Sequence, residues 1–527
     1  MSAALANAAH VADVDVREAS LLRLLTCGSV DDGKSTLLGR MLYDSHAVLD
    51  DQLVALDRDS RKFGTHGEHL DFALLVDGLS AEREQGITID VAYRYFSTPK
   101  RSFIVADTPG HEQYTRNMAT GASTAELAII LVDARKGILP QTRRHSFIVS
   151  MVGVRHVVLA VNKMDLVDFD QKTYDDIVAA YAETVASLGF ETIVPIPLCA
   201  REGDNIAERS TRTPWFHGTP LLEYLETVSI GEAPDQAKRL HFPVQWVNRP
   251  NLDFRGYAGT IATGKVVVGE GVMVLPNKRH SRIARIVTAD GDLQTASAGQ
   301  AVTLTLADEI DVSRGDVIVH EASIMQARKG ITARVLWMAD EPLRVGQSFI
   351  IKLGTVEVNA DVVRLRNAVD IHSFEDRPAD VLAMNAIGVI DLNFDKAIAA
   401  TVYGRDRELG SFILIDRMTN QTVALGTVQA DRLTRANDNV RGHALTGLVG
   451  EPGSQQRWNF WTSVGRKATE SVVLFLVVAL FARSLWLALA VTLADLVLRP
   501  AADRLAAWGW QLVFAEYRPR VTGGHAD

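Results

Sequence analysis

Hydrophobic residues in the first 230 positions gather in short continuous runs that are separated by amphipathic stretches. The runs lie at residues 21–27, 102–106, 127–132, 156–161 and 192–196. A continuous apolar run of this length is typical of a strand that is buried on both faces of a parallel sheet. The spacing after the first run predicts a helix over residues 35–43, whose apolar face carries Leu37, Leu38, Met41 and Leu42. We therefore predict an α/β domain over residues 20–230, after a flexible lead-in over residues 1–19.

Beyond residue 240 the apolar runs become shorter and turns become frequent. One set of short runs lies at 256–263, 265–268, 272–275, 282–288 and 301–306, and a second at 333–337, 348–352, 362–365 and 387–392. Asp290 and Gly291 form a hairpin signal within the first set. The pattern predicts two antiparallel β-barrel domains, over 240–328 and 330–435, which follow a polar linker over 228–239.

The last part of the chain, residues 450–527, is predicted to be an apolar helical tail. Residues 471–482 are uncharged and mostly apolar, Arg483 and Ser484 interrupt them, and the apolar pattern resumes over 485–494. A single membrane span would place Arg483 near the bilayer centre, at a cost of about 3 kcal/mol. A hairpin that turns at Arg483 avoids this cost, and basic residues on both flanks favour a cytoplasmic location for both ends. We expect membrane contact through 471–498; the alternative is a buried helical hairpin that docks on a partner or on the chain itself.

Composition narrows the class of protein. A chain of 527 residues is expected to form about three or four domains. Its net charge of −9 argues against a protein built to hold nucleic acid, so we expect no nucleic-acid partner. Two cysteines make no disulfide framework, and the N-terminus shows no secretory signal. We expect a cytoplasmic protein, associated with the inner face of the plasma membrane through the tail.

A phosphate-binding loop follows the first predicted strand. It fits the pattern G-x-x-x-x-G-K-[ST] and comprises Gly28, Ser29, Val30, Asp31, Asp32, Gly33, Lys34 and Ser35, with Thr36 next in the helix. The glycines let backbone N–H groups turn toward a polyphosphate, and the helix N-terminus adds partial positive charge. Lys34 is expected to reach the β- and γ-phosphates, and the Ser35 hydroxyl to bind Mg²⁺.

Two further strings supply the rest of a magnesium and hydrolysis site. Thr88, in a string that runs from 82 to 90, is expected to contact Mg²⁺ only when the γ-phosphate is present. The strand over 102–106 delivers a second string, made of Asp107, Thr108, Pro109, Gly110 and His111. A carboxylate at Asp107 suits the second Mg²⁺ contact, and His111 is placed to orient the attacking water. We predict Lys34, Thr88 and His111 as catalytic residues, and Ser35, Thr88 and Asp107 as metal ligands.

The base is predicted to be guanine. The strand over 156–161 ends in Asn162, Lys163, Met164 and Asp165. A carboxylate at Asp165 can accept two hydrogen bonds from guanine N1–H and the 2-amino group, a donor pair that adenine lacks. The small residues Cys199 and Ala200 follow the last strand and let a backbone N–H reach the guanine oxygen. The strings together predict a GTP-binding domain with GTP and Mg²⁺ as cofactors.

These strings resemble the translational GTPase superfamily that includes elongation factor Tu, and one branch of it more closely. The Asp31–Asp32 pair, residues 91–98, and residues 214–215 before 220–223 are similar to the large subunit of bacterial sulfate adenylyltransferase. So are residues 242–260 and 308–316 in the first barrel and 410–417 in the second. Cys199 departs from the serine usual in this branch, which we expect to change GTP affinity only slightly.

The resemblance implies a function. The family couples GTP hydrolysis to the formation of adenylylsulfate and pyrophosphate from ATP and sulfate. The adenylyl-transfer site lies on a separate small subunit, which is the expected partner in a heterodimer. Residues 447–454 lack the Gly-Lys-Ser/Thr of a second phosphate loop, so we predict no adenylylsulfate kinase activity. The nucleotide motifs alone also permit an elongation-factor-type GTPase, and the tail permits a membrane-tethered regulatory GTPase.

Overall fold

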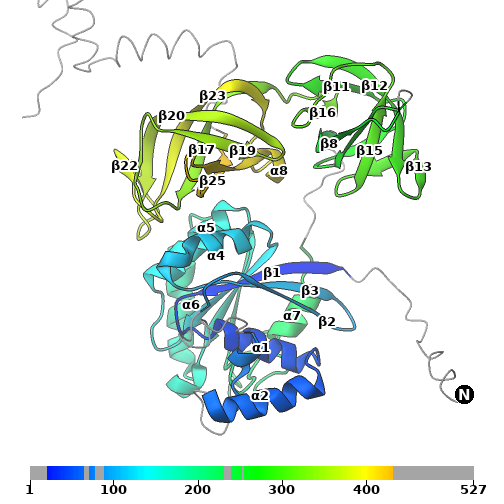
Figure 1. Ribbon diagram of the computed structural model, residues 1–527. Coiled ribbons are helices and arrows are strands. Elements are labelled where there is room, and N and C mark those ends of the chain that lie inside the picture. Colours follow the sequence, from blue (N-terminus) through cyan, green and yellow to red (C-terminus); the bar gives the residue numbers. More distant parts are fainter. Residues whose placement is uncertain (1–19, 64–69, 77–87, 231–238, 252–253, 431–527) are drawn as a thin grey trace, which may run out of the picture. The chain divides into compact units, whose positions relative to one another are not determined.

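The N-terminal domain is built on one six-stranded sheet (Figure 1). The computed structural model describes residues 20–430 apart from 64–69, 77–87, 231–238 and 252–253. The strand order is β2-β3-β1-β4-β5-β6. Their bounds are β1 Leu21–Gly28, β2 Ala92–Ser97, β3 Ser102–Asp107, β4 Leu127–Asp133, β5 His156–Asn162 and β6 Thr192–Pro197. All neighbours are parallel except β2 and β3, which are antiparallel.

Both faces of the sheet are covered by helices, as the continuous apolar runs predict. Every residue of β4 is buried. Leu127, Ile129 and Leu131 belong to one core with residues of α1 (Lys34–Asp44) and α7 (Leu221–Thr227). The alternate residues of β4 join a second core on the other face. That core includes residues of α4 (Thr115–Ser123), α5 (Pro140–Met151) and α6 (Gln171–Val185).

The remaining elements of this domain flank the sheet. They are α2 (Asp50–Phe63) and the short 3₁₀ helices η1 (Phe72–Leu75), η2 (Glu112–Tyr114) and η3 (Met164–Val167). Strand β2 forms the sheet edge, and its outward residues are exposed or half-buried, so it gives no continuous apolar run in the sequence.

The second domain is an antiparallel sheet of short strands, with the order β7-β16-β11-β12-β15-β9-β8. Its strands are β7 His241–Pro243, β8 Trp246–Asn248, β9 Gly256–Thr260, β11 Gly271–Leu275, β12 Arg279–Thr288, β15 Ala301–Leu306 and β16 Val317–His320. The predicted hairpin at Asp290 joins β12 to β13 (Gly291–Leu293), and Thr288 pairs with Gly291. Strands β10 (Lys265–Val267) and β14 (Thr295–Ser297) form a small separate ribbon.

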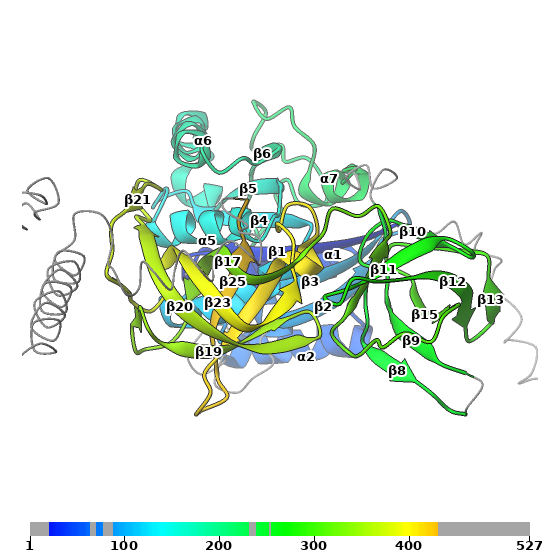
Figure 2. The same cartoon turned by 90° about the horizontal axis from the view of Figure 1, so that it is seen from above.

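The third domain is a closed barrel, because the outer strand β19 pairs with both β24 and β20 (Figure 2). Its strands are β17 Ala327–Trp337, β19 Ser348–Leu353, β20 Val356–Val369, β23 Ile387–Ala399, β24 Ser411–Ile415 and β25 Thr422–Val428. The smaller elements are β18 Leu343–Arg344, β21 Asp376–Arg377, β22 Val381–Leu382 and α8 Arg407–Gly410. Strand β17 begins a few residues before the predicted start of this domain at 330.

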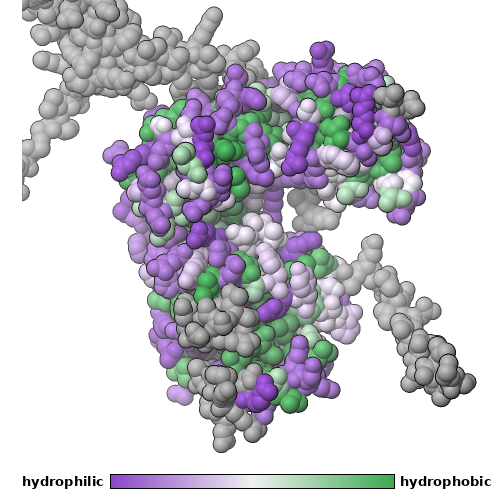
Figure 3. Space-filling view, in the orientation of Figure 1, coloured by the Kyte–Doolittle hydropathy of each residue, from purple (hydrophilic) through white to green (hydrophobic). Residues whose placement is uncertain are grey.

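The surface of the described residues mixes hydrophilic and hydrophobic side chains on the face shown in Figure 3. No helix within the described ranges is both long and apolar enough to span a membrane. The predicted lead-in over 1–19, most of the linker and the predicted apolar tail over 450–527 lie outside the described residues.

Gly39 shows how closely α1 packs against its neighbour. A Cβ atom at this buried position would overlap the backbone carbonyl group of Phe72 in η1. Alanine favours a helix over glycine by about 1 kcal/mol, so helix propensity alone predicts that Gly39→Ala stabilises the protein. The steric overlap acts in the opposite direction and involves backbone atoms, which yield little.

We therefore expect Gly39→Ala to lower the free energy of unfolding by about 1–3 kcal/mol. Urea denaturation followed by circular dichroism measures the shift in the transition midpoint. Gly404→Ala is the matched control, because no atom of the described ranges lies within 4 Å of a Cβ at Gly404. An unchanged or higher midpoint for Gly39→Ala would contradict the packing of η1 on α1.

Candidate GTP-binding site

The phosphate-binding loop lies between β1 and α1, at the carboxyl edge of the sheet, where open α/β folds bind ligands. Gly33 caps α1 with a left-handed backbone (φ 90°), which suits glycine. A Cβ at Gly33 would lie 2.5 Å from the Asn162 side-chain nitrogen, so only glycine lets the loop approach the base-binding strand. The loop therefore has the close backbone approach that a polyphosphate cradle needs.

Lys34 is buried within this loop. Its Nζ donates to the carbonyl oxygen of Ser29 at 2.8 Å, and burial lowers the pKa of its ammonium group although Asp107 and Asp32 raise it. The hydroxyl of Ser29 and one carboxylate oxygen of Asp32 are buried and have no hydrogen-bond partner among the described residues. The buried ammonium group of Lys34 suits an anionic ligand, because phosphate oxygens can accept charge-assisted hydrogen bonds from it.

Three oxygen-bearing side chains meet beside the loop. The Ser35 hydroxyl donates to Asp107 Oδ2 at 3.2 Å, and it lies 3.3 Å from the Thr88 hydroxyl. The other Asp107 oxygen accepts a hydrogen bond from the buried Thr26 hydroxyl at 2.8 Å. Two hydroxyls and a carboxylate are the hard oxygen ligands that Mg²⁺ prefers. The structure thus brings the three predicted metal ligands together, with Thr26 orienting the carboxylate.

Gly110 and His111 follow Asp107. A Cβ at Gly110 would lie 2.6 Å from Lys34 Nζ, so this backbone closes directly over the phosphate loop. The His111 ring caps η2 by accepting from the Gln113 backbone N–H, and it lies 5.9 Å from the Tyr114 ring. The described contacts of this ring are therefore with its own segment and not with the Ser35–Thr88–Asp107 cluster.

The base-binding strings are tied to the phosphate loop by Asn162. Its amide nitrogen donates to the Asp32 carbonyl at 2.8 Å, and its amide oxygen accepts from the Ala200 N–H at 3.0 Å. Lys163 has a left-handed backbone (φ 62°), and its Nζ bonds to the Asp31 carbonyl. Its ammonium group also lies 3.1 Å from Asp133 Oδ2. The Asn162 side chain thus links the phosphate loop, the end of β5 and the loop that carries Ala200.

Asp165, the predicted base-reading carboxylate, has partners on both oxygens. The Cys199 thiol donates to Oδ1 at 3.1 Å, and the Arg201 guanidinium donates to Oδ2 at 3.1 Å. Burial, and next the hydrogen bond to Asp165, raise the pKa of the Cys199 thiol to about 12, so the thiol stays protonated. Cys27 is buried in β1, directly before the phosphate loop, and both cysteines are free.

Two predicted ligand-binding residues direct their side chains elsewhere. Met164 is fully buried in the core beside α6, and the Thr108 hydroxyl donates to the Thr26 carbonyl at 2.6 Å. Sequence reasoning missed Thr26, Asp133 and Arg201. Thr26 and Asp133 lie at the ends of apolar runs, which was the available signal, whereas nothing in its sequence context indicated Arg201.

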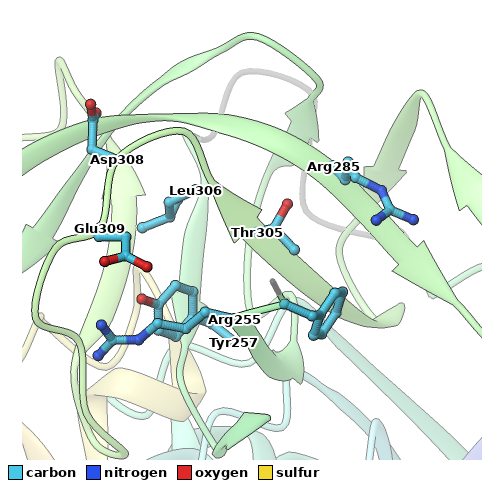
Figure 4. A pocket seen from close by; sticks show the side chains of 8 residues that line it. Arg255, Tyr257, Arg285, Thr305, Leu306, Asp308 and Glu309 are labelled. Atoms are coloured by element: carbon cyan, nitrogen blue, oxygen red, sulfur yellow. The ribbon is translucent and has the colours of Figure 1, made fainter. Parts of the chain in front are cut away.

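A separate cavity of about 200 Å³ lies in the second domain (Figure 4). Its lining residues include Arg255, Tyr257, Thr305 and Glu309. Within the part of the chain that the structure describes, Thr305 Oγ1 is buried and has no hydrogen-bond partner. Its lining lies in the second domain alone, so it is distinct from the nucleotide site.

Comparisons with known proteins identify the family. The model of the elongation factor Tu GTP-binding domain matches residues 19–233, and the eEF1A C-terminal domain-like model matches residues 330–429. A solved structure, Sup35 complexed with GDP, aligns with a TM-score of 0.36 and 21% identity over 78% of this chain and 94% of that one, which adds nothing to the assignment.

Two curated relatives are each 55% identical to the chain. "Bifunctional enzyme NodQ" of Rhizobium sp. (strain N33) aligns over 78% of this chain, which spans only 63% of that relative's length. "Sulfate adenylyltransferase subunit 1" of Citrobacter koseri also aligns over 78% of this chain, but here the alignment covers 86% of the relative. The chain therefore belongs to the sulfate adenylyltransferase subunit 1 family.

Proposed function

We propose that this chain is the GTP-hydrolysing subunit of a sulfate adenylyltransferase and acts with a separate small subunit. The complex would form adenylylsulfate and pyrophosphate from ATP and sulfate, and GTP hydrolysis would drive this uphill reaction. One observation carries the proposal. The oxygen cluster of Ser35, Thr88 and Asp107, the phosphate loop and the residues expected to bind the base all lie at the same edge of the sheet. The relatives named sulfate adenylyltransferase subunit 1 supply the substrate class.

The residues have distinct roles in this proposal. Lys34 would leave the Ser29 carbonyl and neutralise the β- and γ-phosphates. Ser35, Thr88 and Asp107 would hold Mg²⁺, which neutralises charge on the phosphate oxygens. His111 would turn from its cap to position the attacking water. Asp165 would read the guanine N1–H and 2-amino group, and Lys163 would cover the base with its side-chain stem.

The contacts of Glu112 give the hydrolysis site a route to the third domain. Glu112 follows His111 directly, and its carboxylate lies 2.7 Å from the Arg144 guanidinium in α5. Its carbonyl accepts a hydrogen bond from the Asn385 side chain of the third domain at 3.0 Å. A switch segment that relaxes after hydrolysis would therefore change the contact with Asn385 in the third domain.

Three finer parts of the proposal rest on sequence alone. They are the absence of adenylylsulfate kinase activity, a cytoplasmic location, and contact of residues 471–498 with the inner face of the membrane.

The coupling is tested by GTP hydrolysis with and without the small subunit, ATP and sulfate. We expect strong stimulation only when all three are present, together with formation of adenylylsulfate. Lys34→Ala in the same complex should abolish both reactions, because the phosphates lose their cation. Hydrolysis that is indifferent to partner, ATP and sulfate would favour a translational or regulatory GTPase instead, and RNA capture by the chain would favour the former.

Asp165→Asn tests the base assignment. We expect GTP affinity to fall about 100-fold, because a charged acceptor of two hydrogen bonds is lost. Xanthosine triphosphate should regain affinity, since its carbonyl replaces the 2-amino group and accepts from the new amide. Competition against a fluorescent guanine nucleotide measures both values. Asp168→Asn is the control, because Asp168 is exposed three residues away; equal losses in the two variants would contradict the assignment.

Thr26→Val removes the hydroxyl that orients Asp107 while keeping the side-chain shape. We expect the Mg²⁺ concentration for half-maximal GTP hydrolysis to rise about tenfold, as is common when an outer-shell partner of a metal ligand is lost. Thr26→Ser should restore the wild-type dependence because it keeps the donor. A Mg²⁺ titration unchanged in Thr26→Val would remove Asp107 from the metal site.

A further inference from the structure

Arg201 occupies the carboxylate that is expected to read the base. Its guanidinium donates to Asp165 Oδ2 at 3.1 Å while the Cys199 thiol holds Oδ1. The Asp165 side chain is only 13% exposed, whereas that of Arg201 is 38% exposed. Both oxygens that guanine needs are therefore engaged by the chain itself.

The same guanidinium has a second partner at hand. Arg201 also donates to Glu202 Oε1 at 2.7 Å. The other Glu202 oxygen bonds to Arg212, which also pairs with Asp204 and lies 4.5 Å over the Phe169 ring. Arg201 and Arg212 lower the pKa of Glu202, so this carboxylate is ionised. It can therefore keep its ion pair with Arg201 when the contact between Arg201 and Asp165 breaks. When Arg201 leaves Asp165, its guanidinium therefore stays paired with Glu202.

We propose that Arg201 is an intramolecular competitor of guanine for Asp165, and that it sets the affinity and the lifetime of the bound nucleotide. The inference rests on the proposed GTP site. Hydrogen bonds from the base are strongest to a carboxylate that carries its full charge. A guanidinium on the same oxygen neutralises that charge, so guanine must displace Arg201 or accept weaker bonds. In either case Arg201 opposes binding and speeds release.

The direction of the effect separates this role from ordinary electrostatics. Removing a cation near a triphosphate site normally weakens binding, because phosphate attraction is lost. Competition for Asp165 predicts the reverse, tighter binding when Arg201 is removed. Glu202 has the opposite role: without its charge, Arg201 rests more fully on Asp165 and competes harder.

The test measures dissociation constants and dissociation rates of a fluorescent GDP with the full chain. Arg201→Met is expected to tighten binding and slow release about three- to fivefold, the effect of one solvent-screened ion pair. Glu202→Gln is expected to weaken binding and speed release. Arg209→Met is the matched control, because Arg209 lies in the same segment but bonds to the His217 carbonyl; it should leave both values unchanged.

A double-variant cycle assigns the effect to Asp165. In an Asp165→Asn chain, tested with a fluorescent xanthosine diphosphate, Arg201→Met should no longer tighten binding. Weaker GDP binding by Arg201→Met, or equal tightening in both backgrounds, would overturn the competition. A wild-type chain that binds no guanine nucleotide would overturn the proposed function as well, whereas firm wild-type binding with an inert Arg201→Met would overturn this inference alone.

Discussion

The geometry of the nucleotide site depends on the amide of Asn162. Its nitrogen donates a hydrogen bond to the Asp32 carbonyl of the phosphate loop, and its oxygen accepts one from the Ala200 N–H in the loop after β6. Asn162 ends β5, and it is 2% exposed, so its hydrogen bonds form where water does not compete. Because Gly33 has no side chain, the phosphate loop comes close enough to make this bridge. The distance between the phosphate end and the base end of the site follows from this one residue.

Most of the N-terminal fold was predictable, because its strands are buried on both faces and its ligand-binding loops carry strict patterns. The runs at 127–132 and 156–161 correspond to β4 and β5, with ends within one residue. Strand β2 was not predicted, because an edge strand with one exposed face carries polar and aromatic residues and not a continuous apolar run. The β-barrels were predictable as a class. Which strands close the third domain was not, since β19 pairs with β24, a strand far away along the chain, and such a pairing leaves no local signal.

The nucleotide site likewise has residues that the sequence predicts and residues that only the structure reveals. Asp107, Ser35 and Thr88 were expected together from motif spacing, and their side chains meet. The residues that orient these ligands were not predicted. Thr26, for example, reaches Asp107 only because β1 and β3 pair in the sheet, which the fold alone reveals. Arg201 is the clearest case. A charged residue in a loop is usually solvated, and only the structure shows that it ends on the base-reading carboxylate.

The closed third-domain barrel has a mechanical consequence. In an open sheet an edge strand can slip along its neighbour, and the rest of the sheet stays in place. In this ring each strand, β19 included, is held on both sides, so one strand cannot slide without breaking two ladders at once. A pull applied at Asn385, just before β23, is therefore not dissipated by local shear. A displacement at Asn385 would instead be shared by the whole ring of strands, because no strand can move alone.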